Sequence, residues 1–556
     1  MVSFNADARL AELEMRAILF VLVAFAHADG HFDASEQSFI RDVADQLIDR
    51  RADELYGADP LTRSNVVPQW RAHFYHAITS IDHEVRTAFT ESVAAGESAG
   101  QFASSLLKLR CYELLQRLGE GNRAALLHMV DGLIHADGHV HPNEQRFRDE
   151  LVALLRDDPS TAAPASPYSR RGSAMILDEP RARPPKQLDH PFFRGSEHRY
   201  STDPAVFAHQ AAADVEVIRQ VEARLWEQRA RGQNRLASAP TFAAFAGQAP
   251  FLDGHVYVVP PQPGKEYELL VLGDLHGCYS CLKSAVMQGE FFARVEAYRE
   301  SPQRAPYPML VLLGDYIDRG HLSYDGILRT ALRLFLAAPE HVFVLRGNHE
   351  HYMIVGDRIE SPVRPSEAIH SISAIAPRAL LDAHLRLFEL LPSMLVFDRT
   401  IFVHAGIPRE DTGTARLGTL AGLNDPELRQ QMTWSDPSDA DHVPIELQRA
   451  NARFPFGRSQ FKRFMTRIGC STMIRGHERV IEGIRTVYSD PEATLLSLFS
   501  AGGATNEDLP ATSNYREVTP MALTIRHRDG MSRVSPFPIE YARYSDPSVN
   551  GFNVRR

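Results

Sequence analysis

Five short apolar runs in the second half of the 556-residue chain constrain its fold more than any other feature. Each run is too short for an ordinary helix, and each is followed by a loop or a helix. This pattern is typical of strands that are buried on both faces, and it predicts an α/β domain. The runs lie at residues 269–272, 309–313, 342–345, 394–397 and 401–403.

Residue types that bind metal ions follow several apolar runs, each time beside a glycine that lets the backbone turn sharply. Asp274 and His276 are two residues apart at an expected strand end, so their side chains point the same way. Loops at one edge of a sheet converge, and the clusters together therefore predict one site. The clusters contain Asp274 and His276, then Asp315, Asp318 and Arg319, then Asn348, His349 and Glu350, then His404, and finally His477.

The ligand types in these clusters indicate which ions the site would bind. Taken singly, each cluster is also compatible with an ordinary Gly-Asp turn or a hydrogen-bonded histidine. Carboxylate, imidazole and amide groups together suit hard or borderline divalent ions such as Mn²⁺, Fe or Zn²⁺. A central aspartate can bridge two such ions held about 3.5–4 Å apart, and the bridging water becomes a hydroxide that attacks phosphorus in line. The clusters therefore predict a two-metal phosphatase site.

The motifs resemble the phosphoprotein phosphatase (PPP) family of calcineurin-like metallophosphoesterases over about residues 267–501. The resemblance implies a metallophosphoesterase-type β-sandwich flanked by helices. It includes a Trp434-Ser435-Asp436-Pro437 motif and an Asn451-x-Arg453 motif. The other motifs are Asp274-x-His276-Gly277, Gly314-Asp315-Tyr316-x-Asp318-Arg319-Gly320, Gly347-Asn348-His349-Glu350, His404-Ala405-Gly406 and Arg475-Gly476-His477.

The resemblance also implies a role for each matched residue and a pair of divalent ions, with Mn²⁺ expected and Fe or Zn²⁺ as alternatives. His349 would protonate the leaving oxygen, oriented by Asp318. Arg319 and Arg453 would bind the phosphoryl oxygens, for which a planar guanidinium is well shaped. The metal ligands would be Asp274 and His276 on the first ion, Asp315 as the bridge, and Asn348, His404 and His477 on the second ion.

One stretch departs from the family pattern. Where the family has Ser-Ala-Pro-Asn-Tyr-Cys after its last strand, this chain has Ser500-Ala501-Gly502-Gly503-Ala504-Thr505. The tyrosine and cysteine that overhang the site in the family are therefore absent from this stretch. The change bears on substrate preference and toxin sensitivity, and it leaves the metal ligands untouched.

The first 155 residues predict an all-α domain built on an internal repeat. The unit His-Ala-Asp-Gly occurs at Asp29 and again at Asp137, an offset of 108 residues. The repeat resembles the TerB-like helical domain of tellurite-resistance proteins. Its acids could bind a divalent cation, but Asp33-x-x-Glu36 also forms a capping box, and helix capping is the favoured interpretation. The acids concerned are Asp29, Asp33 and Glu36 in one copy and Asp137 and Glu144 in the other.

The expected domain order continues with a flexible linker rich in Pro, Arg and Ser at 156–189 and a helical connecting segment at 190–266. The catalytic domain is expected at 267–556. No predicted metal ligand precedes Asp274, so the N-terminal domain is expected to steer location or protein partners and to perform no chemistry.

The leading functional hypothesis is hydrolysis of phosphomonoesters, above all phosphoserine or phosphothreonine in proteins. The alternatives are a nucleotide hydrolase of the diadenosine-tetraphosphatase type and a pseudophosphatase that only binds phosphoproteins. The formal charge of −10 argues against a nucleic-acid partner, and no run is long and apolar enough to predict a membrane span. Four cysteines are too few for a disulfide framework, which favours a cytoplasmic location.

Overall fold

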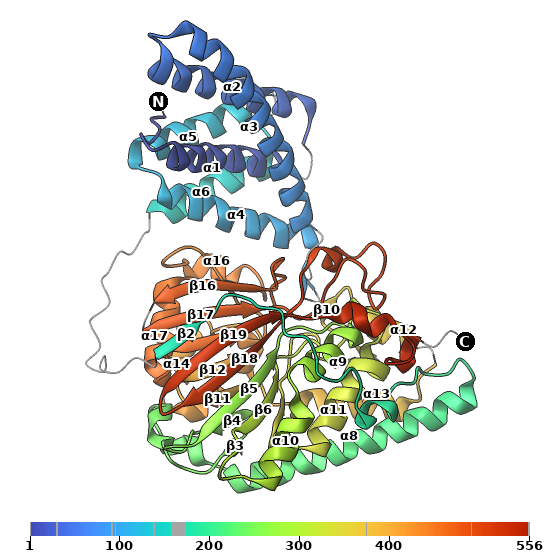
Figure 1. The fold of residues 1–556 in the computed structure, drawn as a ribbon. Coiled ribbons are helices and arrows are strands. Elements are labelled where there is room, and N and C mark those ends of the chain that lie inside the picture. Colours follow the sequence, from blue (N-terminus) through green and yellow to red (C-terminus); the bar gives the residue numbers. More distant parts are fainter. Residues whose placement is uncertain are drawn as a thin grey trace. The chain divides into compact units, whose positions relative to one another are not determined.

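A computed structural model describes residues 2–28, 32–89, 93–94, 96–136, 140–156, 174–373, 375–490 and 492–553. Contacts divide the chain into two units. The helical unit comprises residues 1–164 and 438–451, and the sheet unit comprises residues 165–437 and 452–556. The expected fold class, an α/β region with abundant sheet preceded by a helical region, is confirmed (Figure 1). None of the described helices combines the length and apolarity that crossing a membrane requires.

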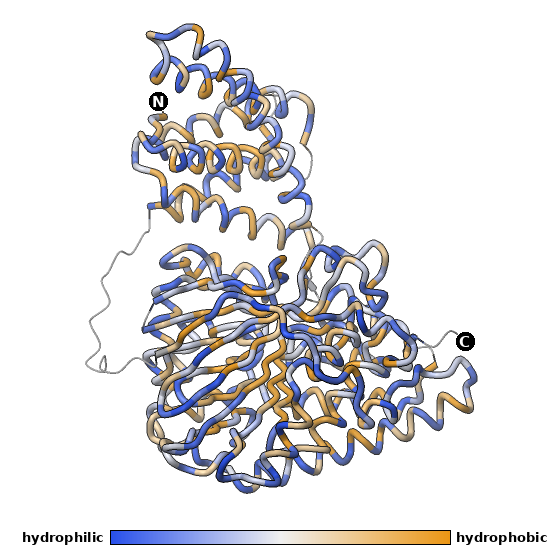
Figure 2. The backbone as a smooth tube through the Cα atoms, in the orientation of Figure 1, coloured by the Kyte–Doolittle hydropathy of each residue, from blue (hydrophilic) through white to orange (hydrophobic). Residues whose placement is uncertain are grey.

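The helical unit is organised around one apolar helix. Helix α1 (Ala8–Ala26) is buried from Ala17 to Ala26 without interruption, and Figure 2 shows most of it in the colours of hydrophobic residues. A helix that is apolar on all sides must be surrounded by other helices. Those helices are α2 (Ala34–Tyr56), α3 (Pro60–Ala88), α4 (Ala99–Arg117), α5 (Glu120–Ile134) and α6 (Pro142–Arg156).

The repeated acids serve as helix caps wherever the structure describes them. Asp33 accepts hydrogen bonds from the backbone N–H groups of Ser35 and Glu36, and Glu36 accepts one from the N–H of Asp33, which completes the capping box. In the second copy Glu144 accepts from the N–H of His141 at 3.2 Å. Asp29 and Asp137, the other candidate cation ligands, lie outside the described residues.

One segment of the helical unit comes from far along the sequence. Residues 438–451, which the sequence analysis placed within the 267–556 catalytic region, pack with the N-terminal helices. Ala440, Val443 and Leu447 are 5%, 0% and 6% exposed and belong to the apolar core around α1. The segment contains the short helix α16 (Ile445–Arg449).

The sheet unit contains a six-stranded and a seven-stranded sheet that share an apolar core. The order of the first sheet is β2 (Ala174–Leu177), β19 (Met531–Pro538), β18 (Met521–Arg528), β5 (Glu266–Leu272), β6 (Tyr307–Leu312) and β7 (Val342–Val344). The order of the second sheet is β16 (Ile484–Asp490), β17 (Ala493–Leu498), β15 (Thr472–Arg475), β12 (Thr400–Val403), β11 (Met394–Phe397), β4 (Val256–Val259) and β3 (Phe251–Asp253).

The period of two along the strands explains why these sheets are buried on both faces. In β11, Leu395 and Phe397 enter the core shared by the two sheets. Met394 and Val396 enter a separate core on the opposite face, together with residues of α17 (Arg458–Ile468). A strand that is covered on both faces needs apolar residues at successive positions, which explains the near-continuous apolar runs in the sequence.

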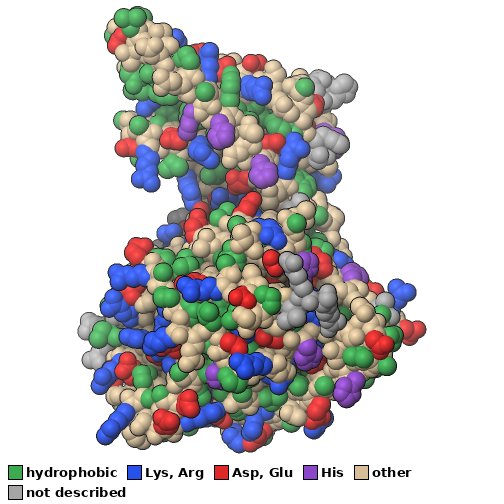
Figure 3. Space-filling view, turned by 45° about the vertical axis from the view of Figure 1, so that its right-hand side comes forward, with side chains coloured by type: hydrophobic (Ala, Val, Ile, Leu, Met, Phe, Trp, Pro, Cys, Tyr) green, Lys and Arg blue, Asp and Glu red, His purple; other side chains and the backbone are tan. Residues whose placement is uncertain are grey.

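Helices also cover the six-stranded sheet (Figure 1). They include α8 (Pro204–Gly232), α9 (Tyr279–Gln288), α10 (Phe291–Glu300), α11 (Arg329–Ala337) and α13 (Arg378–Leu390). On the face of the sheet unit in Figure 3, basic and acidic side chains are interspersed. A face of mixed charge fits the modest net charge of −10.

Candidate active site

The predicted clusters lie where parallel strands end. Strands β5, β6 and β7 run parallel to one another, and the chain leaves them toward Asp274, Asp315 and Asn348 respectively. In the other sheet, β12 and β15 are parallel and lead to His404 and His477. The carboxyl ends of parallel strands share one edge of a sheet, and loops there can place side chains from distant sequence positions in one site.

Strained backbone is concentrated in these loops. Nine non-glycine residues among the described ones have a positive φ, and five of them are predicted site residues. Such a conformation costs on the order of 1–3 kcal/mol per residue and persists where the surroundings hold it. The five are His276 (40°), Asp315 (55°), Asp318 (69°), Arg319 (67°) and His477 (70°).

Two glycines make room for the carboxylates. A Cβ on Gly347 would lie 2.2 Å from Oδ1 of Asp315, and a Cβ on Gly476 would lie 2.1 Å from Oδ1 of Asp274. Any larger residue at either position would displace a predicted metal ligand. The Gly-Asn-His and Gly-His motifs therefore have a steric reason at this site.

Two groups of side chains in the described part of the chain could each hold a metal ion, and they share Asp315. One consists of His276, Asp315 and His349, and the other of Asp315, His404 and His477. In the first group, Nε2 of His276 lies 3.4 Å from Oδ2 of Asp315 and 3.7 Å from Oδ2 of Asp274. In the second group, Nε2 of His404 lies 3.4 Å from Oδ1 of Asp315. One carboxylate with an oxygen toward each group is the arrangement that a bridging ligand requires.

The second group is completed by Asn348 and His477. The terminal amide of Asn348 approaches both carboxylate oxygens of Asp315 to 3.1–3.2 Å and Nδ1 of His477 to 3.2 Å. The same amide atom lies 3.0 Å from Nε2 of His404. All six predicted ligands therefore lie in one cluster around Asp315. Five of them are buried, and His477 is intermediate in exposure.

The hydrogen bonds around the cluster leave lone pairs directed inward. Nδ1 of His276 lies 2.9 Å from the carbonyl of Ile317, and Nδ1 of His404 lies 3.1 Å from the carbonyl of Leu313. A proton on each Nδ1 leaves Nε2 as an acceptor that faces other acceptors. Oδ2 of Asp274 is buried without a hydrogen-bond partner. Imidazole and carboxylate acceptors that converge in this way around the Asn348 amide fit one or two bound cations.

Burial sets the charge states in the cluster. Desolvation lowers the pKa values of His276, His404 and His477 well below the usual range, which keeps these imidazoles neutral and able to bind metal. Desolvation also raises the pKa of Asp274 to about 7 and the pKa of Asp315 well above its usual value, with the neighbouring carboxylate adding to the second shift. Ionised carboxylates here need a nearby positive charge, which a divalent ion would supply.

The predicted acid and its orienting carboxylate are in contact. Nδ1 of His349 lies 2.6 Å from Oδ2 of Asp318, whose other oxygen accepts the N–H of Ala368 at 2.7 Å. Nε2 of His349 is thereby turned toward Oδ2 of Asp315, at 3.9 Å. Burial, and then the guanidinium of Arg319, lower the pKa of His349 well below its usual value.

The two predicted phosphate-binding arginines flank the cluster. Arg319 lowers the pKa of His276 and His349 by its charge, and it donates to the carboxylate of Glu367 at 2.7–2.9 Å. Arg453 lowers the pKa of His477 and forms an ion pair with Asp436. The charges of the two arginines therefore affect different histidines of the cluster, Arg319 those of the first group and Arg453 the His477 of the second.

Glu350 is a site residue to which the sequence analysis gave no role. Its buried carboxylate accepts the backbone N–H groups of Asp315 (2.7 Å), Tyr316 (2.8 Å) and Gly347 (3.0 Å). It thereby joins the loop after β6 to the loop after β7. The glutamate directly follows His349 in a quoted motif, so the sequence did contain a signal for it.

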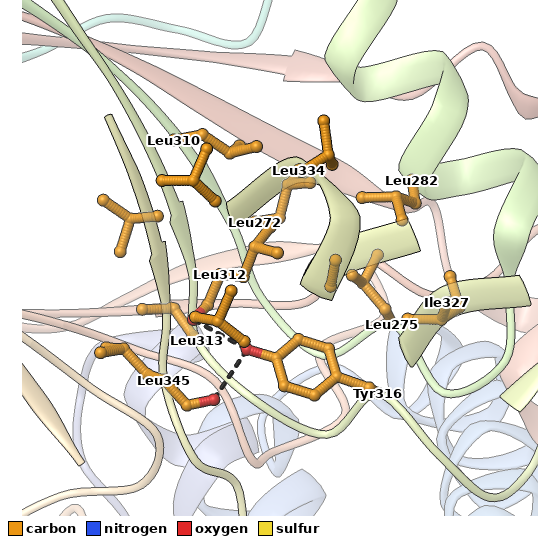
Figure 4. Close-up of a cluster of buried hydrophobic side chains, with 14 of the residues drawn as sticks. Leu272, Leu275, Leu282, Leu310, Leu312, Leu313, Tyr316, Ile327, Leu334 and Leu345 are labelled. Atoms are coloured by element: carbon orange, nitrogen blue, oxygen red, sulfur yellow. Dashed lines mark hydrogen bonds between the residues drawn. The ribbon is translucent and has the colours of Figure 1, made fainter. Parts of the chain in front are cut away.

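Tyr316 also anchors the loop that carries Asp315, from the side of the apolar core. Its hydroxyl donates to the carbonyls of Leu312 (3.2 Å) and Leu345 (2.7 Å), at the ends of two neighbouring strands. Figure 4 shows its ring beside leucine side chains of the shared core, including Leu275 and Leu313. The loop that carries Asp315 is therefore fixed both by a carboxylate and by a buried aromatic ring.

Asp436 and Arg475 form a second unassigned pair, although both lie within quoted motifs. Oδ1 of Asp436 accepts from Nη2 of fully buried Arg475 at 2.7 Å. The other oxygen, Oδ2, pairs with Arg453 and lies 3.9 Å from Nε2 of His477. Asp436 therefore links a phosphate-binding candidate to a metal-ligand candidate.

A tyrosine from a later segment lies beside the cluster. The ring of Tyr515, in the short helix Asn514–Glu517, lies 5.4 Å from the ring of His276 and 5.2 Å from that of Phe499. The neighbouring Arg516 donates to the carbonyls of Ala504, Leu509 and Pro510 and so closes the loop. The 500–505 stretch lacks the family's tyrosine, and the structure supplies an aromatic ring from position 515 instead.

Comparison with known proteins bears directly on this site. Residues 267–480 match the family model described as calcineurin-like phosphoesterase. This stretch of the chain is therefore similar to calcineurin-like phosphoesterases. The match includes every strand-end cluster from Asp274 to His477 and leaves the helical unit's first 164 residues outside it.

The relatives found include a curated protein and a solved structure. A protein of Encephalitozoon cuniculi (strain GB-M1), named "Probable serine/threonine-protein phosphatase", is 26% identical over 235 residues. The match covers 41% of this chain and 46% of that relative, so the chain spans less than half of its length. A solved Saccharomyces cerevisiae protein serine/threonine phosphatase, described as similar to human phosphatase PP5, is 15% identical, with a TM-score of 0.36 over 59% of this chain and 90% of that one.

Proposed function

We propose that the sheet unit is a metal-dependent phosphatase that hydrolyses phosphoserine and phosphothreonine in proteins. The observation that carries the proposal is that two potential metal-binding groups share Asp315, and that His349 of the first group is held by Asp318. Asp274, His276 and Asp315 would hold one divalent ion, and Asp315, Asn348, His404 and His477 the other. The ligand types suit Mn²⁺ best, with Fe and Zn²⁺ as alternatives.

The chemistry that two divalent ions supply in such a site is polarisation of the phosphoryl group and activation of water as the nucleophile. The protein's own residues orient the ester around that chemistry. Arg319 and Arg453 would bind phosphoryl oxygens as forks, since a guanidinium matches the spacing of two oxygens. Because both arginines pair with carboxylates, Glu367 and Asp436 respectively, they are held in place before the substrate arrives.

His349 would give its proton to the leaving oxygen. Asp318 holds Nδ1, so the proton that can be transferred is the one on Nε2. Since burial and Arg319 lower the pKa of His349, the imidazolium needs a nearby negative charge to form. The bound phosphate dianion supplies that charge and thereby couples protonation of His349 to substrate binding.

The remaining proposals concern location and the helical unit. We place the phosphatase in the cytoplasm, and we take the helical unit as a TerB-like module that binds a protein partner. What supports the second proposal is the repeated helix pair and its apolar central helix α1.

The test is a substrate and metal matrix. Metal-free protein is reconstituted with Mn²⁺, Fe²⁺, Zn²⁺ or Mg²⁺ and assayed on a phosphoserine peptide, a phosphotyrosine peptide and a dinucleoside polyphosphate. We expect the highest kcat/KM on the phosphoserine peptide with Mn²⁺. Faster turnover of the dinucleotide would overturn the proposal in favour of a nucleotide hydrolase, and binding without turnover on every substrate would indicate a pseudophosphatase.

A further inference from the structure

Residues 438–451, which we name the strap, begin and end beside the candidate site. The residue before Pro437 is Asp436, and the residue after Ala452 is Arg453. These two side chains form an ion pair, and Asp436 also accepts from Arg475. The strap itself packs within the helical unit, while both of its neighbours belong to the sheet unit. One loop therefore connects the helical core covalently to two residues of the site.

A buried glutamate of α4 holds the start of the strap. Oε1 of Glu113 accepts from the hydroxyl of Ser438 and from the backbone N–H of Asp439, the latter at 3.1 Å. Its other oxygen accepts from Arg110 at 2.8 Å, and the side chain is only 2% exposed. A buried carboxylate with three donors is a directional anchor, because its loss leaves those donors without their acceptor.

Charge and apolar burial add to that anchor. The carboxylate of Asp439 lies 3.2 Å from Arg117 and 3.5 Å from Arg110, both on α4. Further along, Val443 is fully buried in the core around α1. A surface loop would normally avoid such burial, since loops of ordinary enzymes run over their own domain and stay exposed.

A short ladder joins the two ends of the strap, so a shift of the strap can displace the site residues next to it. Asp436 pairs with Pro455, and Pro437 with Phe456, in a two-residue parallel ladder. The N–H of Asp436 donates to the carbonyl of Phe454 at 2.9 Å. This ladder is short, so contacts at the far end of the 14-residue strap add to what holds its base.

We propose that the helical unit positions Asp436 and Arg453 through the strap, and that Glu113 is the positioning residue at its anchor. This proposal rests on the proposed phosphatase function for its kinetic consequences. It assigns the N-terminal unit a part in phosphate binding, although none of its residues needs to touch the substrate.

The experiment compares full-length variants loaded with Mn²⁺. Glu113→Ala removes the anchor, and Glu113→Gln keeps an amide oxygen that can still accept from Ser438 and Asp439. Ser438→Ala with Asp439→Ala weakens the same anchor from the strap side and leaves the helical core unchanged. Glu36→Gln is the matched control, because Glu36 is also buried in the helical unit but serves the cap of α2.

Three quantities are measured: hydrogen exchange of peptides covering 438–451 and 452–457, the Kd of inorganic phosphate, and kcat and KM on a phosphopeptide. In Glu113→Ala we expect faster exchange in both peptides. We also expect a Kd and a KM raised about tenfold, on the scale of one charge-assisted hydrogen bond, with kcat changed less. Glu113→Gln should recover part of the loss, and Glu36→Gln should match the wild type.

The proposal would be overturned if hydrogen exchange became faster in the strap but stayed unchanged in residues 452–457, with unchanged phosphate affinity. Movement of the strap would then not be transmitted to the site. If Glu113→Ala does not fold, the double variant Ser438→Ala/Asp439→Ala decides by the same readouts. Absence of turnover in the wild type with every metal would refute the phosphatase function instead. Hydrogen exchange would still decide whether the strap is coupled to Arg453.

Discussion

Glu350 offers a sharp test of how the site is held, because it touches the loops and is not a proposed metal ligand. In Glu350→Gln, the amide oxygen can replace Oε2, which accepts from Asp315 and Gly347. The amide NH₂ then faces the N–H of Tyr316, which loses its acceptor. A hydrogen bond to a buried charged group contributes about 1.5–3 kcal/mol to stability. With the unsatisfied N–H donor included, we expect the free energy of unfolding to fall by about 2–4 kcal/mol.

Part of that cost should appear as weaker metal binding, since the affected loop carries Asp315. Loss of a group that orients a ligand typically lowers metal affinity or activity about 10–100-fold. The assay is Mn²⁺ titration of metal-free protein by calorimetry, with phosphopeptide turnover measured at each metal concentration. We expect an Mn²⁺ Kd at least about tenfold weaker.

The control is Glu216→Gln, whose side chain is 49% exposed and pairs with Arg219, itself 64% exposed, on α8. Exposed ion pairs contribute little, so this variant should match the wild type in metal affinity. A folded Glu350→Gln protein with wild-type metal affinity and turnover would refute the idea that Glu350 sets the position of Asp315.

Two further predictions concern the acid and one arginine. His349→Gln should lower kcat by about 10²–10⁴ on a phosphoserine peptide and much less on a nitrophenyl ester, whose leaving group needs no proton; equal losses on both substrates would contradict the acid role. Glu367→Gln should raise KM by no more than about fivefold, because the half-exposed Glu367 that holds Arg319 in place contributes at most about 1 kcal/mol; a decrease in KM measured by the same steady-state assay would show that Glu367 competes with the substrate for Arg319 instead.

The sequence predicted the strand ends and the ligand types because both depend on local patterns. The apolar runs at 269–272 and 401–403 became parts of β5 and β12, and the loops that follow them place Asp274 and His404 in one cluster with Asp315. The convergence of Asp274 with His477 follows from the parallel strand order, which places distant loops together.

Other features depend on tertiary contacts that no local pattern contains. The positive φ of Asp315 and His477 requires neighbours that hold a strained backbone, and sequence alone does not show those neighbours. The placement of Tyr515 beside His276 depends on a loop closed by Arg516. The strap carried one overlooked signal, since Val443 and Leu447 are apolar residues in what reads as a loop.

The most direct test of the two-metal account is Asp315→Asn, studied by metal titration of metal-free protein together with turnover. Asp382→Asn is the matched control, because Asp382 pairs with Arg378 on the surface of α13. We predict that the wild type and the control bind two equivalents of Mn²⁺ and turn over the phosphopeptide. The folded Asp315→Asn protein should lose tight binding of at least one ion and nearly all turnover. Two tightly bound ions with wild-type turnover in Asp315→Asn would contradict the account.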